Sequence, residues 1–337
     1  MRLYWINCYN KNIKSFIQIS YIKLIDYLFN NLGRQVFMNK DKALSANRNI
    51  KDNYKLGILM MIISSICFAL MAVIVKYIGN LQLMEIVLFR NIPSMIIIPI
   101  ILRKKNIPLF GNNKLVLSMR GFFGVIGMVG MFYTYTIMLL TDAVTIQKLT
   151  PFFVVIFSGI FLKEKIYFQQ IPIFLLAFLG GLLIIRPGFR IDLFPAIIGL
   201  FAATSMAAAH VTLRFLRLSD HYLLIINYFA YISGVASLII LLFQRNLIIP
   251  SLPDFLVLIF LGLVGLFSQI ALTKAYQLAP ASLVSLYSYS EIIFSIIFSI
   301  LLFKEIPNIL SIGGASFIII SGYLNYSLKV TDQKNSE

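Results

Sequence analysis

The stretch Ser285–Glu305, SLYSYSEIIFSIIFSILLFKE, decides the class of protein to which this chain belongs. About twenty of its residues suit hydrocarbon, which is enough for one helix to cross the ~30 Å apolar core of a bilayer. Glu291 lies near the middle of this run, where a carboxylate costs at least ~2.5 kcal/mol. The stretch therefore predicts a membrane-spanning helix with an acid at mid-depth that needs a functional or structural explanation.

Similar apolar runs recur along the chain. Its 337 residues are 59% hydrophobic and 12% charged, whereas an average soluble domain is about 25% charged. This composition predicts an all-α membrane protein with ten transmembrane helices. The expected spans are 56–78, 83–102, 119–140, 143–162, 169–186, 193–214, 222–243, 253–275, 280–302 and 308–328.

The net charge of +16 reflects topology better than nucleic-acid binding, because the lysines and arginines lie in loops and tails. With the region before Leu56 in the cytoplasm, most of these cations, Arg120 among them, fall on the cytoplasmic side. The cations on the opposite side are Lys76, Arg186, Arg190, Arg245 and Lys304. The bias predicts an inner-membrane protein with both termini cytoplasmic.

Residues 1–55 form a basic N-terminal segment that is expected to be cytoplasmic, and residues 329–337 form a cytoplasmic tail. Residues 1–37 lack a cleavage site of small residues, so a secretory signal fits poorly. They are either an interfacial amphipathic segment or an extension before a true start at Met38. Cys8 and Cys67 are far apart, and the two histidines lack ligand-spaced partners, so neither a metal nor another cofactor is expected.

The two halves of the chain resemble each other when the sequence is shifted by 141 residues. Phe157-Ser158 then matches Phe298-Ser299, and Lys163-Glu164 matches Lys304-Glu305. Each half, 56–187 and 193–328, contains five expected spans, so the second must be inverted relative to the first. Inverted repeats are typical of secondary transporters, whose substrate site lies near the midplane between the repeats. Glycines every three residues from Gly121 to Gly130 favour close helix packing, with or without gating.

Two long motifs resemble a known family. FYTYTIMLLTDAVTIQKLTPFFVVIFSGIFLKEK (Phe132–Lys165) and ALTKAYQLAPASLVSLYSYSEIIFSIIFSILLFKE (Ala271–Glu305) resemble the ends of the two EamA repeats of the drug/metabolite transporter superfamily. LMEIVLFRNIPSMIIIPI (Leu83–Ile100) resembles the family's second span. Ile292 departs from the pattern, because second repeats commonly have proline there, and this puts the local helix break in doubt.

The whole sequence is similar to the S-adenosylmethionine uptake transporters of obligate intracellular bacteria. The resemblance implies a carrier of two inverted five-helix EamA repeats that brings S-adenosylmethionine across the inner membrane, by uptake or by exchange for a related metabolite. The expected partners are this small-molecule substrate and the lipid bilayer. The scattered cations argue against a nucleic-acid partner, and the oligomeric state stays open.

Polar residues inside the spans are the candidate site, because each costs free energy unless it faces the bundle interior. The repeat places Lys148 and Glu291 on opposite walls of one central cavity. A carboxylate suits the substrate's cationic groups, a cation suits its carboxylate, and aromatic faces suit the adenine and sulfonium. The candidates for these roles and for hydrogen bonding are Glu291, Lys148, Arg90, Tyr287, Tyr289, Tyr228, Gln147, Asn227 and Gln269.

Structural explanations compete with these roles. Glu291 either contacts substrate or a coupling ion, or forms a buried ion pair with Lys148 or Arg90. Arg90 is either a substrate contact or a structural partner of Glu85, and Lys163-Glu164 is expected to anchor a span at the interface. The alternative functions are a proton-coupled exporter of amino acids or drugs, and a scaffold. A membrane enzyme is disfavoured, because the chain lacks a nucleophile with a base, a metal-ligand cluster and a phosphate loop.

Overall fold

The computed structural model describes residues 52–78, 81–137, 146–164, 167–185, 193–244, 250–303 and 309–336. Contacts divide the chain into two units, Met1–Lys51 and Asp52–Glu337, and the description that follows concerns the second. The predicted basic segment therefore lies almost entirely outside the described residues.

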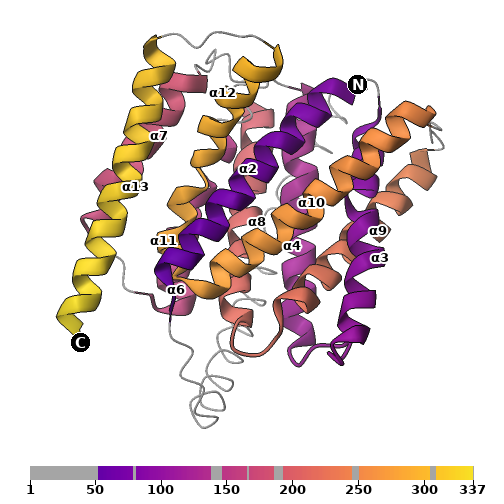
Figure 1. Cartoon of the computed structure of the whole chain (residues 1–337), viewed down its shortest axis with the longest axis horizontal. Coiled ribbons are helices and arrows are strands. Elements are labelled where there is room, and N and C mark those ends of the chain that lie inside the picture. The colour runs from indigo at the N-terminus through magenta and orange to yellow at the C-terminus, as the bar shows by residue number, and fades with distance from the viewer. Residues whose placement is uncertain are drawn as a thin grey trace, which may run out of the picture. The chain divides into compact units, whose positions relative to one another are not determined.

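The described residues form helices and no strands (Figure 1). The helices are α2 (Tyr54–Ile78), α3 (Leu83–Lys104), α4 (Lys114–Ile137), α6 (Thr150–Leu162), α7 (Gln170–Ile185), α8 (Leu193–Leu216), α9 (Tyr222–Gln244), α10 (Leu252–Leu278), α11 (Ala281–Tyr287), α12 (Ser290–Phe303) and α13 (Ile309–Ser336). Within these residues, seven segments are long and apolar enough to span a membrane, and Thr150–Leu162, Gln170–Leu183 and Ile312–Leu328 are shorter apolar helices. The all-helical membrane class predicted from sequence is confirmed.

The helices differ in detail from the expected spans at three places. Helix α4 begins at Lys114 rather than at residue 119, so Arg120, expected at the cytoplasmic start of this span, lies in the second turn of the helix and is only 2% exposed. The span expected at 280–302 is broken into α11 and α12. Helix α13 continues to Ser336, so most of the expected C-terminal tail is helical.

The helices of the two halves pack on each other in a recurring pattern (Figure 1). Helix α4 packs on α8, and α10 packs on α2. In the same way α3 packs on α10 and α9 on α4, while α12 packs on α2 and α6 on α8. Helices α3 and α9 pack directly on each other, as do α7 and α13. Each main contact between the halves thus has a counterpart in which the halves exchange places.

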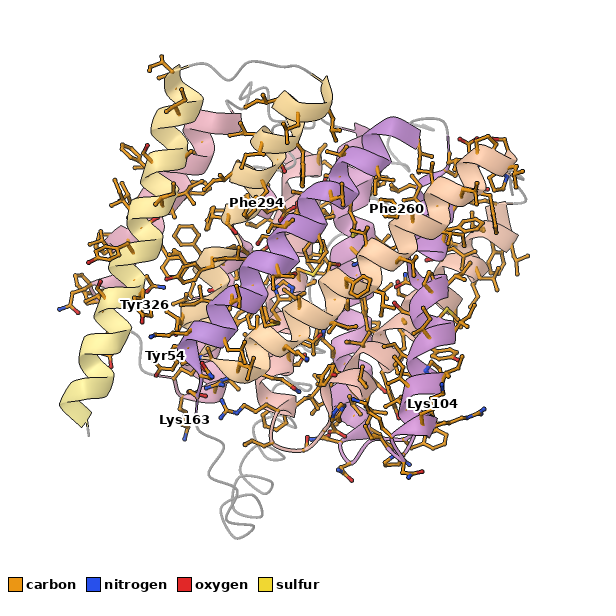
Figure 2. The ribbon with its side chains drawn as sticks, viewed as in Figure 1. Tyr54, Lys104, Lys163, Phe260, Phe294 and Tyr326 are labelled. Atoms are coloured by element: carbon orange, nitrogen blue, oxygen red, sulfur yellow. The ribbon has the colours of Figure 1, made fainter. Side chains whose placement is uncertain are left out.

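Apolar side chains cover the outside of this bundle, and small polar groups lie inside it. Phe168 and Phe243 are largely exposed, as lipid-facing residues should be. In Figure 2 Phe260 and Phe294 lie partway along the helices, whereas Lys104 and Lys163 lie toward one end. Buried serines and asparagines instead form hydrogen bonds between helices. Ser64 Oγ donates to the Ser268 carbonyl at 3.1 Å, and Asn91 Nδ2 donates to Ser233 Oγ at 2.9 Å.

Two glycines confirm the expected close packing. A Cβ on Gly127 would lie 3.0 Å from the backbone nitrogen of Met206 in α8. A Cβ on Gly262 would lie 2.7 Å from the carbonyl oxygen of Phe89 in α3. These glycines therefore set the distance between helices of the two halves.

Candidate functional site

Two breaks in the helices lie at matching places in the two halves. A turn at Lys148–Leu149 precedes α6, and a turn at Ser288–Tyr289 separates α11 from α12. A shift of 141 residues carries Lys148 onto Tyr289, so the breaks coincide in the repeat. Broken helices at the centre of a bundle expose backbone polar groups and are typical of transporter sites.

Each break has a different local cause. In the first half Pro151 lies in the first turn of α6. It has no N–H to donate to a carbonyl of the preceding turn, so a helix readily begins there. The second half has Ile292 instead of the family's proline, yet the break is present. There Ser288 Oγ donates to the Ser285 carbonyl at 2.7 Å, and Ser290 Oγ donates to the Tyr287 carbonyl at 2.6 Å. Such hydroxyl bonds occupy carbonyls at the break and compete with helical hydrogen bonding.

The two breaks contact each other through their side chains. Lys148 Nζ lies 2.9 Å from Glu291 Oε2, and the two side chains are 10% and 31% exposed. The Tyr289 hydroxyl donates to the Lys148 carbonyl at 2.6 Å, so repeat-equivalent residues bond each other. Glu291 lies in the first turn of α12, where the helix dipole also favours a negative charge. Of the ion pairs expected for Glu291, the structure contains the one with Lys148.

Three of the other predicted site residues, Gln147, Tyr287 and Tyr228, have different surroundings. Gln147 hydrogen-bonds the sulfur of Met131 and lines a small cavity between α4 and α8. The Tyr287 hydroxyl donates to the Gly322 carbonyl at 2.7 Å and so joins α11 to α13. Tyr228 is partly buried on α9, with no hydrogen bond to another described residue.

The remaining candidates are buried apart from the Lys148–Glu291 pair. Arg90 is 8% exposed, and its Nη1 donates to the sulfur of Met128 at 3.5 Å. Within the described residues it forms no ion pair, so the expected pairing with Glu85 or Glu291 is not found. The side-chain oxygen of Asn227 and the side-chain nitrogen of Gln269 are buried with no described hydrogen-bond partner.

Sequence reasoning missed Arg120 as a site candidate, because it counted this residue among the cytoplasmic cations at the start of the expected span 119–140. Its guanidinium carbon lies 4.5 Å from the ring centroid of Phe229, and that of Arg90 lies 6.0 Å from the same centroid. A cation on an aromatic face gains about 0.5–2 kcal/mol, whereas an arginine at the bilayer centre costs about 2.5–3.5 kcal/mol or more. The run of glycines from Gly121 was the available signal, because Gly124 leaves the space that Arg120 and Phe229 fill.

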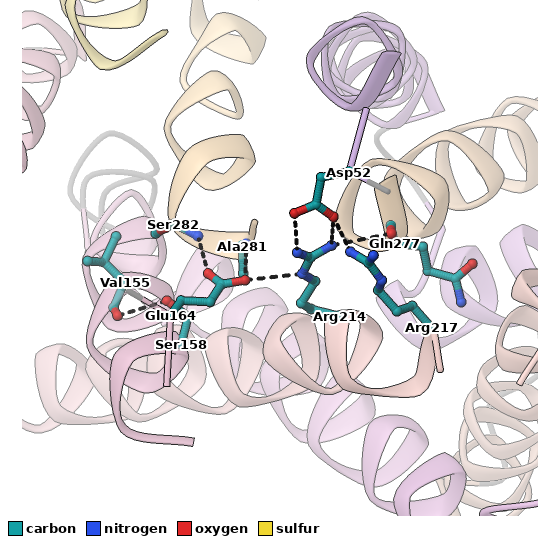
Figure 3. Close-up of polar contacts among 9 residues, drawn as sticks. All are labelled: Asp52, Val155, Ser158, Glu164, Arg214, Arg217, Gln277, Ala281 and Ser282. Atoms are coloured by element: carbon teal, nitrogen blue, oxygen red, sulfur yellow. Dashed lines mark hydrogen bonds and ion pairs between the residues drawn. The ribbon is translucent and has the colours of Figure 1, made fainter. Parts of the chain in front are cut away.

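A network of ion pairs joins the helix ends on one side of the bundle (Figure 3). Arg214 forms two hydrogen bonds to Asp52, at 2.9 and 3.0 Å, and one to Glu164 Oε1 at 3.1 Å. Arg217 also pairs with Asp52. Glu164 accepts from the backbone nitrogens of Ala281 and Ser282, at 3.2 and 3.3 Å, and so caps α11. We call these residues the Arg214 network.

Burial dominates the electrostatics of Asp52 in this network. It raises the pKa of the Asp52 carboxyl above its ordinary value of 3.8, although Arg214 acts in the opposite direction. Glu164 does more than anchor a span at the interface, because it links α6, α8 and α11. The network therefore holds together, at one end, segments from both halves of the chain.

A helical bundle in which two helix breaks meet in an ion pair is typical of membrane transporters. A model of the EamA-like transporter family matches residues 55–186 and 193–327. The chain belongs to this family, and the two matched regions coincide closely with the two halves expected from the sequence.

Three relatives are named as an exporter, a solute carrier and an uptake transporter. The chain is 30% identical over 277 residues to the pseudopaline exporter CntI of Pseudomonas aeruginosa, covering 81% of this chain and 96% of CntI. It is 36% identical over 285 residues to solute carrier family 35 member G1 of Mus musculus, covering 79% of this chain and 77% of that protein. It is 27% identical over 269 residues to the S-adenosylmethionine uptake transporter of Rickettsia prowazekii, covering 79% of this chain and 90% of that protein.

A solved crystal structure also resembles this chain. The TM-score is 0.73 at 13% sequence identity, and the match covers 81% of this chain and 98% of the solved chain. At this identity the likeness shows the fold alone.

Proposed function

We propose that this protein is a secondary carrier that imports S-adenosylmethionine across a bacterial inner membrane by alternating access between two inverted repeats. The repeats are supported by the recurring helix contacts between the halves and by the matching 141-residue shift. A carrier with this symmetry has two related conformations, each open on one side of the membrane.

The observation that carries this proposal is the contact between the two helix breaks. The Lys148–Glu291 pair and the Tyr289–Lys148 hydrogen bond join the halves near the centre of a span. Glu291 is the eleventh residue of the span Ala281–Leu302, which puts it near mid-depth. A site there is reached from either side when one half rocks against the other.

In this proposal Glu291 receives a cationic group of the solute after separating from Lys148. Its partial exposure favours this role over a fully enclosed ion pair. A carboxylate of the solute is then bound by a cation, either Lys148 once it is free or a buried arginine such as Arg90. Tyr289, whose hydroxyl donates to the Lys148 carbonyl, lies at the same helix break. S-adenosylmethionine has an ammonium, a sulfonium and a carboxylate, so it offers a group for each. The resemblance to the Rickettsia prowazekii uptake transporter supports this substrate.

The Arg214 network supports alternating access, because it joins the helix ends on one side of the bundle. The Lys148–Glu291 ion pair lies at the centre. The network connects Asp52 before α2, Glu164 after α6 and Arg214 in α8. An opening movement on that side must break these contacts. The network is thus a candidate gate for the conformation described.

A second candidate is an exporter of small metabolites with proton coupling at Glu291. The 30% identity to the pseudopaline exporter CntI over 81% of this chain favours it. Release of a proton from Glu291 would then restore the ion pair with Lys148. The two candidates share the site and differ in cargo and direction.

Proteoliposomes containing the full chain separate these candidates. We expect saturable uptake of labelled S-adenosylmethionine, and faster uptake when unlabelled compound is preloaded inside. Glu291→Gln is expected to abolish uptake and leave the protein folded, whereas the control Asp254→Asn, at the exposed start of α10, leaves uptake unchanged. Absence of saturable uptake in the wild type refutes the first candidate, and movement of other metabolites driven by a pH gradient supports the second.

A further inference from the structure

Two buried arginines meet on one aromatic ring inside the bundle. Arg90 comes from α3, Arg120 from α4 and Phe229 from α9. The guanidinium carbons lie 6.0 and 4.5 Å from the ring centroid. The exposed fractions of the two arginines are 8% and 2%. Their charges repel each other, so the arrangement needs a compensating partner.

The described residues supply no such partner. The ion pairs of Lys148, Arg214 and Arg217 involve neither arginine. Nε of Arg90, and Nε and Nη1 of Arg120, are buried and donate to no described acceptor. One ring offsets only part of the cost of two desolvated cations, because cation–π contacts are weaker than the lost hydration.

The surroundings are shaped around these side chains. A Cβ on Gly124 would lie 2.8 Å from Phe229 Cε2, and a Cβ on Gly265 would lie 2.9 Å from Arg90 Cγ. Gln269 lies four residues after Gly265, on the same face of α10, and its unpartnered nitrogen is a further donor. The two glycines therefore let Arg90, Arg120 and Phe229 lie close to the backbones of α4 and α10, and the donors of this cluster lack described acceptors.

We propose that Arg90 and Arg120 form a binding site for a carboxylate group of the transported solute, which lies in the guanidinium forks beside Phe229. A guanidinium binds a carboxylate through two parallel N–H···O bonds, which satisfies both charge and geometry. Lys148 is a poorer receptor in this conformation, because Glu291 already occupies its ammonium at 2.9 Å. The inference rests on the proposal that the chain is a carrier, and it does not depend on which solute is carried.

The first experiment uses purified full-length protein in detergent and measures its melting temperature. Succinate and its uncharged diamide, succinamide, are titrated at constant ionic strength. We expect succinate to raise the melting temperature and succinamide to leave it unchanged. Arg120→Gln should raise the half-maximal succinate concentration about tenfold to a hundredfold, Arg120→Lys should raise it less, and Arg103→Gln, at the exposed end of α3, should not change it.

The second experiment compares S-adenosylmethionine with its decarboxylated analogue as ligands. We expect at least about tenfold weaker binding of the analogue to the wild type, and equal binding of both to Arg120→Gln. Arginine-dependent succinate binding without S-adenosylmethionine binding supports the carboxylate site and refutes the proposed cargo. S-adenosylmethionine binding that ignores both the carboxylate and Arg120 overturns the site and leaves the carrier intact.

A purely structural role for the two arginines has its own signature. Arg120→Gln would then lower the melting temperature and leave the response to succinate unchanged, which overturns the site. If Arg120→Gln fails to fold, the wild-type comparison of succinate with succinamide and the Arg120→Lys titration decide the question. Equal effects of succinate and succinamide on the wild type also overturn it.

Discussion

Glu164→Gln removes the negative charge from the centre of the Arg214 network. Glu164 Oε1 lies 3.1 Å from Arg214 Nε, and the side chains are 11% and 12% exposed. Its two oxygens also accept from the backbone nitrogens of Ala281 and Ser282, at 3.2 and 3.3 Å. Loss of these charged contacts should destabilise this closed end, while the glutamine carbonyl still accepts one hydrogen bond.

The magnitude follows from the burial of this junction. Hydrogen bonds to a charged group contribute about 1.5–3 kcal/mol each, and breaking a buried ion pair costs about 3–5 kcal/mol. With one hydrogen bond kept, we expect a net loss of about 3 kcal/mol. If the network exists only in the closed conformation, its loss raises the ratio of open to closed molecules about a hundredfold.

Cysteine labelling measures this ratio. Ser285 is 1% exposed and lies one turn after the capped start of α11. In a background with Cys8→Ser and Cys67→Ser, we expect Ser285→Cys to react with a membrane-impermeant maleimide up to about a hundredfold faster when Glu164→Gln is present.

Asp254→Asn alters another acid in the first turn of a helix, α10, outside the network, and should leave labelling unchanged. Arg214→Lys keeps the charge and loses the bidentate geometry, so its effect should be intermediate. An unchanged labelling rate in Glu164→Gln, with the protein folded, would show that this network does not gate the bundle.

Three further predictions concern the ion pair, pH and packing. Lys148→Met and Glu291→Gln should each lower the melting temperature, because each leaves one buried charge without its partner. The double variant should regain most of the lost melting temperature. Additive decreases in this double-mutant cycle would contradict a direct ion pair. Because the pKa of Asp52 is raised, the folded state binds more protons than the unfolded state between pH 3.8 and that raised pKa. Its stability should therefore rise as pH falls through this window, and a wild-type and an Asp52→Asn protein with the same pH profile of melting temperature would contradict this. Gly262→Val should lower the melting temperature, because the added side chain would force α10 away from the Phe89 carbonyl. The same change at Gly313, which has open space around it, should have little effect. Equal losses at the two glycines would contradict close packing at Gly262.

The sequence by itself determined the class of protein and the approximate spans, and it singled out Glu291 as a candidate. These inferences need only one-dimensional information, because apolar length and the cost of a buried charge act on each segment separately. The repeat also placed Lys148 opposite Glu291, and the structure confirms that the two side chains meet.

Other features depended on how distant helices pack, so only the tertiary structure decided them. The break at Ser288–Tyr289 has no proline, and serine hydroxyls satisfy its carbonyls instead. In the sequence Arg120 counts as a cytoplasmic cation at a span end, whereas α4 begins at Lys114 and places the Arg120 guanidinium on Phe229. The Arg214 network joins Asp52 to a residue that follows it by 162 positions. No local pattern specifies such contacts, because their free energy arises only after the two halves have packed.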